Sequence, residues 1–414
     1  MIRRFLDGIP VTALGVLALA AGVAMRQYGR HRQDLILYVA GYGVLGIGVV
    51  TALLVIGTAL ILRLSWRPKL REGERVDAGA KVVTGFSLPS LGWLPFVSMR
   101  WQWIEPEQVI VRSVARRGRL VEEVIHGERG EHLRTVRRVV IEDVFGLNRI
   151  GLRLVEPSAW TVLPARGRPP TAPLLQALAG GDQVSHPHGP PDGDLVEMRR
   201  YAPGDPIKRV LWKTFARTRA LMVRLPERAV SPTRRTLAFL VAGDGDEAPA
   251  ALARMALESD ALGPEWRFGA DGSTDDARRL PEALSLIVRS RSARAEGGHG
   301  LAGFFARATD FGAGRCVIFA PATPGSWLST VAAEVKRRPG RVEVVVGTDG
   351  IADPARHRGL RRWLIAPEPE PAGVTRSVDL DSVTRALAAA GATVTVIDRP
   401  SGRVLGRGAR RRAA

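Results

Sequence analysis

The chain has 414 residues and a formal net charge of +19, from 60 Lys and Arg against 41 Asp and Glu. This length allows two or three domains with ample cores, and the positive charge indicates an anionic partner or surface. Nearly all basic residues are arginine in an Ala-, Gly- and Pro-rich chain, and no RNA-recognition or zinc-finger motif is present, so we expect no nucleic-acid ligand. The single cysteine, Cys316, excludes an internal disulfide and reads as a small buried apolar residue.

Two apolar segments occupy the N-terminal part. Residues 9–25 and 35–62 would span about 26 and 42 Å as helices, and residues 26–34 form a polar loop between them. We therefore predict a transmembrane hairpin over residues 1–71, in contact with membrane lipid; a cleaved signal peptide is the alternative for the first segment.

Basic residues are more numerous at the outer ends of this hairpin than in its loop. That bias predicts a multi-pass protein of the inner membrane whose termini and soluble domains face the cytoplasm. The flanking residues are Arg3, Arg4, Arg63, Arg67, Lys69 and Arg71.

Residues 72–164 contain short β-rich runs separated by Gly and charged turns, which predicts a small β-sandwich. We expect Asp143 to form a turn that places Phe145 in the sandwich core. For Trp93, Trp101 and Trp103 we favour core packing, with contact to the bilayer interface as the alternative.

Residues 165–193 are rich in Pro and Gly and read as a linker with a short helix at 174–178. His186 and His188 flank Pro187 in this linker. Because no third ligand lies nearby in the sequence, we do not expect a metal site there.

The segment at residues 194–230, the signature segment, is dense in Arg, Trp and turn residues. Residues 201–204 read as a turn, because proline presets φ and glycine accepts a positive φ. Asp205 and Pro206 then read as a helix start. We expect the helix to end near Thr218, a strand to follow from Leu221, and the helix to present a basic surface. The stripe Ile207, Val210, Leu211, Thr214 and Phe215 is apolar, with Lys208, Arg209, Lys213 and Arg217 mostly off it.

The signature segment resembles that of the bacterial domain-of-unknown-function fifty-eight family. The matching residues are Glu197, Arg199, Tyr201, Pro203, Gly204, Asp205, Arg209, Trp212, Ala216, Arg217 and Leu221. The resemblance implies a membrane-anchored protein with a von Willebrand factor A-like domain and a MoxR-type AAA+ ATPase as partner. We expect eight residues of this segment to bind protein: Glu197, Arg199, Tyr201, Gly204, Asp205, Arg209, Trp212 and Arg217.

Residues 231–400 alternate between strand and helix patterns, which predicts a doubly wound α/β sheet. Its position after the signature segment fits the von Willebrand factor A-like resemblance. Residues 401–414 form a basic tail that we expect to be disordered and to lie against an anionic membrane surface.

Proteins that resemble this domain hold a divalent cation with Asp-x-Ser-x-Ser after the first strand. In this chain that strand runs into Gly243-Asp244-Gly245-Asp246-Glu247, and both serines are missing. Asp244 and Asp246 are weak candidate ligands, and Asp246 is also a candidate helix cap. We expect that this chain has lost the metal; a metal-dependent adhesion-type module is the alternative.

The functional expectation is a non-catalytic membrane adaptor without a cofactor. The alternative is a hydrolase acting on envelope material. Against the hydrolase, the α/β part has no Gly-x-Ser-x-Gly elbow, no Walker loop and no His-Glu-x-x-His motif.

Overall fold

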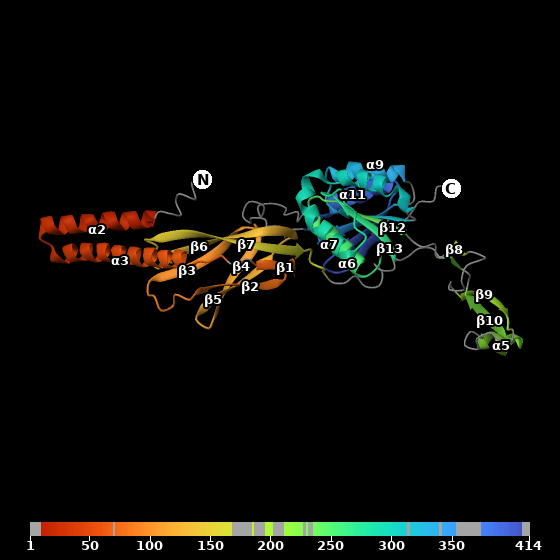
Figure 1. Cartoon of the computed structure of the whole chain (residues 1–414), viewed down its shortest axis with the longest axis horizontal. Helices are drawn as coiled ribbons and strands as arrows, with labels where there is room; N and C mark the ends of the chain where they lie inside the picture. Colours follow the sequence, from red (N-terminus) through yellow and green to blue (C-terminus); the bar gives the residue numbers. More distant parts are fainter. Residues whose placement is uncertain are drawn as a thin grey trace, which may run out of the picture. The chain divides into compact units, whose positions relative to one another are not determined.

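The computed structural model describes residues 10–68, 71–167, 184–185, 195–201, 211–226, 229–230, 235–312, 315–338, 342–352 and 374–407. The chain divides into two compact units, Met1–Ala165 and Arg166–Ala414 (Figure 1). The linker helix predicted at 174–178 and the linker histidines His186 and His188 lie outside the described residues.

Two long helices begin the first unit. Helix α2 (Ala13–Arg32) is capped by Thr12, whose hydroxyl accepts the Gly15 amide hydrogen at 3.0 Å. Helix α3 (Leu35–Ser65) is capped by Asp34, whose carboxylate accepts the Leu37 amide hydrogen at 3.1 Å. The predicted loop at 26–34 is therefore wrong over most of its length. Polar residues with adequate helix propensity continue α2 to Arg32, and only Gln33, in the left-handed region at φ 57°, and Asp34 make the turn.

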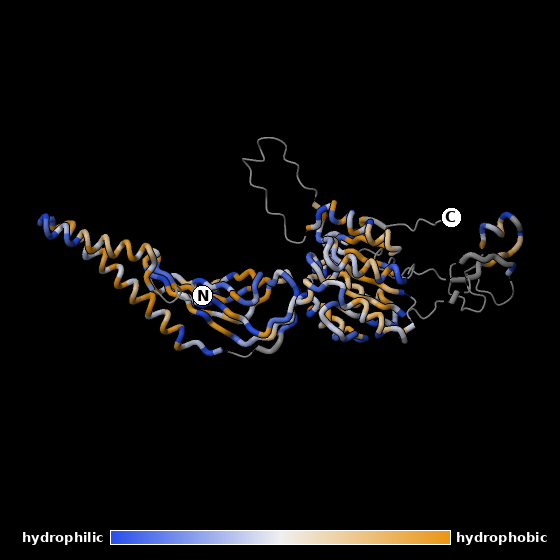
Figure 2. The backbone as a smooth tube through the Cα atoms, turned by 90° about the horizontal axis from the view of Figure 1, so that it is seen from above, coloured by the Kyte–Doolittle hydropathy of each residue, from blue (hydrophilic) through white to orange (hydrophobic). Residues whose placement is uncertain are grey.

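Glycines set the distance between α2 and α3. A methyl group at Gly29 would lie 2.6 Å from the Tyr38 amide nitrogen, and one at Gly41 would lie 2.7 Å from the Arg26 nitrogen. Such small residues let two helix backbones approach closely. Both helices are hydrophobic along most of their length and hydrophilic at the tip where the chain turns from α2 into α3 (Figure 2). Among the described residues, one helix, α3, is long and apolar enough to cross a membrane.

Seven strands follow and form two sheets. A four-stranded sheet has the order β1-β7-β6-β3, and a three-stranded antiparallel sheet has the order β2-β5-β4. The strands are β1 (Arg71–Asp77), β2 (Lys81–Pro89), β3 (Val97–Glu105), β4 (Val109–Arg116), β5 (Arg119–His126), β6 (Gly130–Asp143) and β7 (Arg149–Leu163).

The C-terminal half of α3 completes the hydrophobic core of these sheets. Val55, Ala59 and Leu62 are buried in one cluster with residues of β2, β3, β6 and β7, among them Phe86 and Trp101. The helix predicted as a membrane span thus contributes part of its length to the core of the two sheets.

The aromatic predictions for this unit have mixed outcomes. Trp101 and Trp103 are each 8% exposed, so core packing is confirmed for both, but Trp93 is 78% exposed. The turn at Asp143 is confirmed, since its carboxylate accepts the Phe145 and Leu147 amide hydrogens at 2.8 and 3.2 Å. The expected burial of Phe145 is wrong: the ring is 47% exposed and stacks on Phe96. The ring finds its partner outside the core, because Phe96, on which it stacks, is itself exposed.

The second unit contains a six-stranded sheet in the order β13-β12-β14-β15-β18-β19. The first five strands are parallel, and β19 pairs antiparallel with β18. The strands are β12 (Arg235–Leu240), β13 (Glu265–Ala270), β14 (Arg315–Pro321), β15 (Val342–Thr348), β18 (Thr393–Asp398) and β19 (Arg403–Arg407).

Helices cover both faces of this sheet, because alternate strand residues supply two separate apolar clusters. Phe239, Ile318 and Val344 pack under α8 (His299–Arg307), α9 (Trp327–Arg337) and α11 (Ser377–Ala389). Leu240 and Phe319 pack on the other face, under α6 (Glu247–Glu258) and α7 (Leu280–Arg289). The predicted doubly wound α/β arrangement and the burial of Cys316 are confirmed.

Helix α7 begins only at Leu280, because Ala277 exchanges backbone hydrogen bonds with Phe268 at 2.8 and 2.9 Å. One prediction for this unit is wrong in detail. The first residues of the basic tail are ordered as β19, since they satisfy the free edge of β18. The two-stranded pair β16 (Ile351–Ala352) and β17 (Thr375–Arg376) and the 3-10 helices Ser290–Glu296 and Thr309–Phe311 complete the regular elements of residues 235–407, and a second short pair, β8 (Val184–Ser185) and β11 (Ala229–Val230), precedes them.

A glycine-to-alanine pair tests the packing of α6 on β15. A methyl group at Gly347 would lie 2.5 Å from the Pro249 nitrogen, which is helix backbone and cannot yield. We expect Gly347→Ala to cost about 1–3 kcal/mol. Gly303→Ala is the control, since its nearest neighbour is the flexible end of Arg307 at 3.3 Å. The measurement is the urea dependence of thiol labelling at Cys316, a probe specific to this sheet. Equal labelling midpoints for the two variants would contradict the packing.

Candidate functional sites

The described part of the signature segment is a small hairpin with one short helix. Strand β9 (Leu195–Arg200) pairs antiparallel with β10 (Met222–Pro226), so that Glu197 lies opposite Leu225 and Arg199 opposite Val223. Helix α5 (Trp212–Thr218) lies between the two strands in the chain. Four predicted signature residues lie outside the described residues: Pro203, Gly204, Asp205 and Arg209.

The predicted helix is wrong at Leu211, while its first residues, 206–210, lie outside the described residues. Leu211 is its N-cap residue rather than part of the helix. Its amide donates to the Met222 carbonyl at 2.9 Å, which extends the strand pairing instead of the helix. The predicted end near Thr218 and the following strand are confirmed.

Aromatic and basic side chains share the surface of this segment. Trp212 is 58% exposed and packs edge-on against Phe215, with ring centroids 6.3 Å apart. Lys213 and Arg217 are exposed on the same helix. A two-stranded hairpin is marginally stable alone, and here its own residues leave the indole uncovered. Exposed Trp with Arg is the composition typical of a protein-binding hot spot.

The second candidate site is the carboxyl edge, where the parallel strands of the α/β sheet end. The chain leaves β12 toward β13 on one side and returns at β14 on the other, which makes a switch point of the kind at which open α/β sheets bind ligands. Trp327 fills this position. The indole is 1% exposed and donates to the Thr323 carbonyl at 3.1 Å. Methyl groups at Gly243 and Gly297 would each lie 3.2 Å from it.

Asp246 lies at the carboxyl edge and is the N-cap residue of α6, but its side chain makes no capping hydrogen bond to the helix. Its carboxylate accepts the Gly243 amide hydrogen at 3.2 Å and pairs with Arg294 at 2.8 Å. The expected side-chain cap is therefore wrong, because the guanidinium attracts the buried carboxylate more strongly than an uncharged amide does. Arg294 also reaches Glu247 at 3.3 Å. The other metal candidate, Asp244, is exposed and uses its carbonyl to accept the Thr323 hydroxyl hydrogen.

Sequence reasoning missed Asp271, which follows β13 directly. Its carboxylate accepts amide hydrogens from Ala242 at 2.8 Å, Gly298 at 2.7 Å and Gly300 at 3.0 Å. It thereby joins the ends of two strands to the start of α8. Burial raises the pKa of this carboxyl, and the three amide donors oppose that shift. The signal was present, since an apolar run ends in Ala270-Asp271-Gly272.

A further acid of the carboxyl edge also has an internal partner. Asp349, after β15, binds Arg399 at 2.8 Å. Burial raises the pKa of Asp349, although Arg399 pulls it down. Throughout the part of the chain that the structure describes, no three His, Cys, Asp or Glu residues gather closely enough to hold a metal ion.

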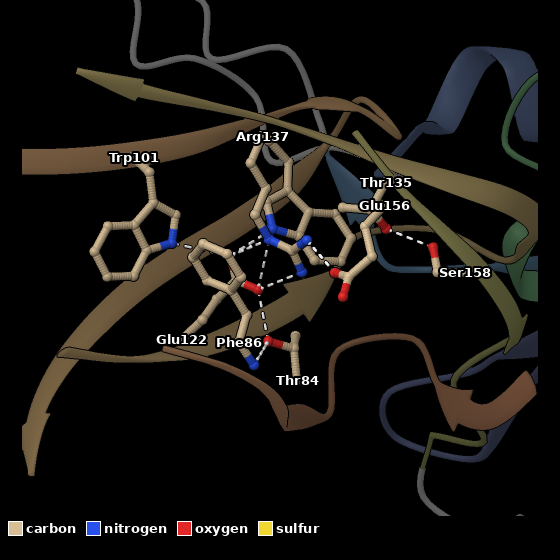
Figure 3. A network of polar contacts seen from close by, with 9 residues as sticks. Thr84, Phe86, Trp101, Glu122, Thr135, Arg137, Glu156 and Ser158 are labelled. Atoms are coloured by element: carbon tan, nitrogen blue, oxygen red, sulfur yellow. Dashed lines mark hydrogen bonds and ion pairs between the residues drawn. The ribbon is translucent and has the colours of Figure 1, made fainter. Parts of the chain in front are cut away.

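A buried ionic network lies between the two sheets of the first unit (Figure 3). Arg137 and Glu122 are 1% and 0% exposed and pair at 2.8 Å, and Arg137 also binds Glu156. Both indoles of Trp101 and Trp103 donate to Glu122, at 2.9 and 2.8 Å. The network is fully partnered, so it orders the core rather than offering a reactive group. Sequence reasoning missed it because Glu122 and Glu123 are adjacent, and the sequence does not show which one faces inward.

His126, at the end of β5, is a buried titratable group of this core whose pKa is strongly shifted. It lies between Trp103 and Trp160, with ring centroids 5.6 and 5.5 Å away, and its Nε2 has no hydrogen-bond partner among the described residues. Burial, with a smaller contribution from His132, lowers the pKa of His126 to about 4.

No protein-family model matches this chain, and no curated protein matches it at a significant level. The resemblance of the signature segment to the domain-of-unknown-function fifty-eight family therefore stays a prediction.

Removing the guanidinium from the carboxyl edge tests its role there. We expect Arg294→Met to destabilise the second unit by about 1–3 kcal/mol, because Asp246 is left as a buried charge without its cation. The double variant with Asp246→Asn should lose less than the two single losses added together. Thiol labelling of Cys316 in urea measures both. Arg235→Met, whose partner Glu265 is 46% exposed, is the control and should change stability by less than about 0.5 kcal/mol. Additive losses would count against the pairing.

The environment of His126 predicts a pH dependence of the first unit. The unfolded state binds a proton near the ordinary histidine pKa of about 6.5, whereas the folded state binds it only near 4. Stability is therefore complete above about pH 6.5 and falls by about 1–3 kcal/mol as the pH decreases toward 4. Tryptophan fluorescence in urea at several pH values measures this. His126→Phe should flatten the dependence, while His31→Gln, at the exposed helix tip, should leave it unchanged.

Proposed function

We propose that this protein is a non-catalytic adaptor anchored in the inner bacterial membrane, with its soluble units in the cytoplasm. It presents a von Willebrand factor A-like α/β domain and the signature segment to a MoxR-type AAA+ ATPase or to a client of that ATPase. The signature residues support this assignment through their resemblance to the domain-of-unknown-function fifty-eight family.

The membrane part of the proposal is supported by α3, which is long and apolar enough to cross a bilayer. Its close, glycine-mediated packing with α2 supports insertion of both helices as a transmembrane hairpin. The excess of basic residues at the outer ends supports the cytoplasmic orientation.

The carboxyl edge supports a binding role over a catalytic one. Trp327 occupies the switch point, and Asp246, Asp271 and Asp349 each have an internal partner. The available surfaces of the unit are thus better suited to contact another protein than to hold a small substrate.

One observation carries the proposal most directly: the exposed Trp212 and Phe215 pair beside Lys213 and Arg217. Burial of the aromatic pair supplies affinity, and the cations select an acidic partner surface and speed association.

Direct binding between the full-length protein in detergent and a MoxR-type ATPase from the same organism tests the proposal. Trp212→Ala should weaken binding by roughly 30-fold, the effect of losing a hot spot of about 2 kcal/mol. Arg217→Glu should slow association and reduce its salt dependence. Lys336→Glu, an equal charge reversal on exposed α9, is the matched control. If both signature variants bind as the parent does, the signature segment is not the interface.

A further inference from the structure

An exposed apolar group lies at the end of the sandwich nearest the helices. Phe96, just before β3, is 50% exposed, and Phe145, in the turn between β6 and β7, is 47% exposed. Their rings stack with centroids 5.7 Å apart. Val144 beside them is 61% exposed. We call Phe96 and Phe145 the phenylalanine pair and residues 143–148 the helix-side turn.

The backbone holds this pair outward at a cost. Phe96 has a φ of 66°, in the left-handed region that a bulky side chain seldom adopts. The Phe96 carbonyl accepts the Val144 amide hydrogen at 3.0 Å, which fixes the two segments side by side. Such strain is kept where the surrounding structure imposes it, and it accumulates at functional positions.

The helix-side turn is fastened to both N-terminal helices. The Thr12 hydroxyl donates to the Gly146 carbonyl at 2.6 Å, and the Thr12 amide donates to the Leu147 carbonyl at 2.9 Å. On the other helix, the Asn148 side-chain amide donates to the Thr51 hydroxyl at 2.8 Å. A methyl group at Gly15 would lie 2.2 Å from the Leu147 carbonyl oxygen, so the contact is as close as the backbones allow. The ends of β6 and β7 that carry the turn point toward these helices (Figure 1).

The length of α2 sets where a bilayer surface would fall. This helix begins at the helix-side turn and ends at the polar tip, and its 20 residues span about 30 Å. That is the thickness of the hydrocarbon core of a bilayer. With the tip at the far surface, the near surface coincides with the helix-side turn. The arginines close to the tip reach the far headgroups with their flexible side chains.

We propose that the phenylalanine pair is inserted in the interfacial region of the same bilayer that holds the helices. This inference rests on the proposed membrane anchoring. Lipid is the occupant for two reasons. Exposed Leu14 of α2 lies beside the turn, since a methyl group at Gly146 would be 3.8 Å from it, so apolar surface runs from the helix to the residue next to Phe145. The pair also lies at the depth where aromatic rings concentrate. Arg149, exposed directly after the turn, meets anionic headgroups. The end of the sandwich is thus seated on the membrane.

Depth-dependent quenching tests the proposal in the full-length chain. In a Cys316→Ala background, an environment-sensitive fluorophore is attached at Phe145→Cys, with Val144→Cys as a second reporter. The protein is reconstituted in phosphatidylcholine and phosphatidylglycerol vesicles with a nitroxide quencher near the headgroups. The control is Leu133→Cys, because Leu133 is 80% exposed and lies at the other end of β6, about 33 Å from the turn.

We expect quenching at positions 144 and 145 to exceed that at 133 several-fold. Quenching as weak at the turn as at position 133, in protein that floats with the vesicles, would overturn the inference and leave the anchoring intact. Equal strong quenching at all three positions would also overturn it, since the sandwich would then lie flat on the bilayer. Protein that does not float with vesicles would overturn the membrane anchoring itself.

Discussion

The contact between the helix-side turn and the N-terminal helices is the joint on which the first unit depends. Asp143 gathers the turn's amides, and the turn then offers its carbonyls to Thr12 and its Asn148 amide to Thr51. Each of these groups is a strong hydrogen-bonding group that would be costly to bury unpaired. Because the bonds reach both helices, α2, α3 and the sheets form one compact unit rather than an anchor followed by a tether.

In the α/β unit, the polar groups at the ends of the strands are paired with one another. Acidic residues follow its strands, and each has an internal partner: Arg294 for Asp246, Arg399 for Asp349 and backbone amides for Asp271. Trp327 closes the remaining space against glycines that alone permit its approach. Because these acidic residues and Trp327 are already in contact with other parts of the unit, they stabilise the carboxyl edge instead of lining an open site.

The sequence predicted what periodicity controls. The doubly wound α/β arrangement, the burial of Cys316 and the strand after Thr218 follow from apolar patterns that are continuous along the chain. The errors arose where a long-range contact decides. Leu211 pairs with Met222 instead of joining the helix, Phe145 stacks on Phe96 from the segment before β3, and Asp246 binds Arg294, 48 residues away, rather than the helix start. The ionic network around Arg137 was unpredictable for the same reason, since its members come from β5, β6 and β7.

The two halves of helix α3 have different surroundings: the first half exposes apolar side chains, and the second half packs against the sheets. Its first half is apolar on all sides, whereas Val55, Ala59 and Leu62 complete a core with Phe86 and Trp101. A fragment of the sheets that starts after α3 would therefore lack the helix residues that cover this core, and it would expose Phe86 and Trp101 to water. With the membrane anchoring proposed above, insertion of α3 would be a step in the folding of the two sheets, because the strands follow the helix in the chain and need it to complete their core. A failure to insert would then misfold the sheets as well.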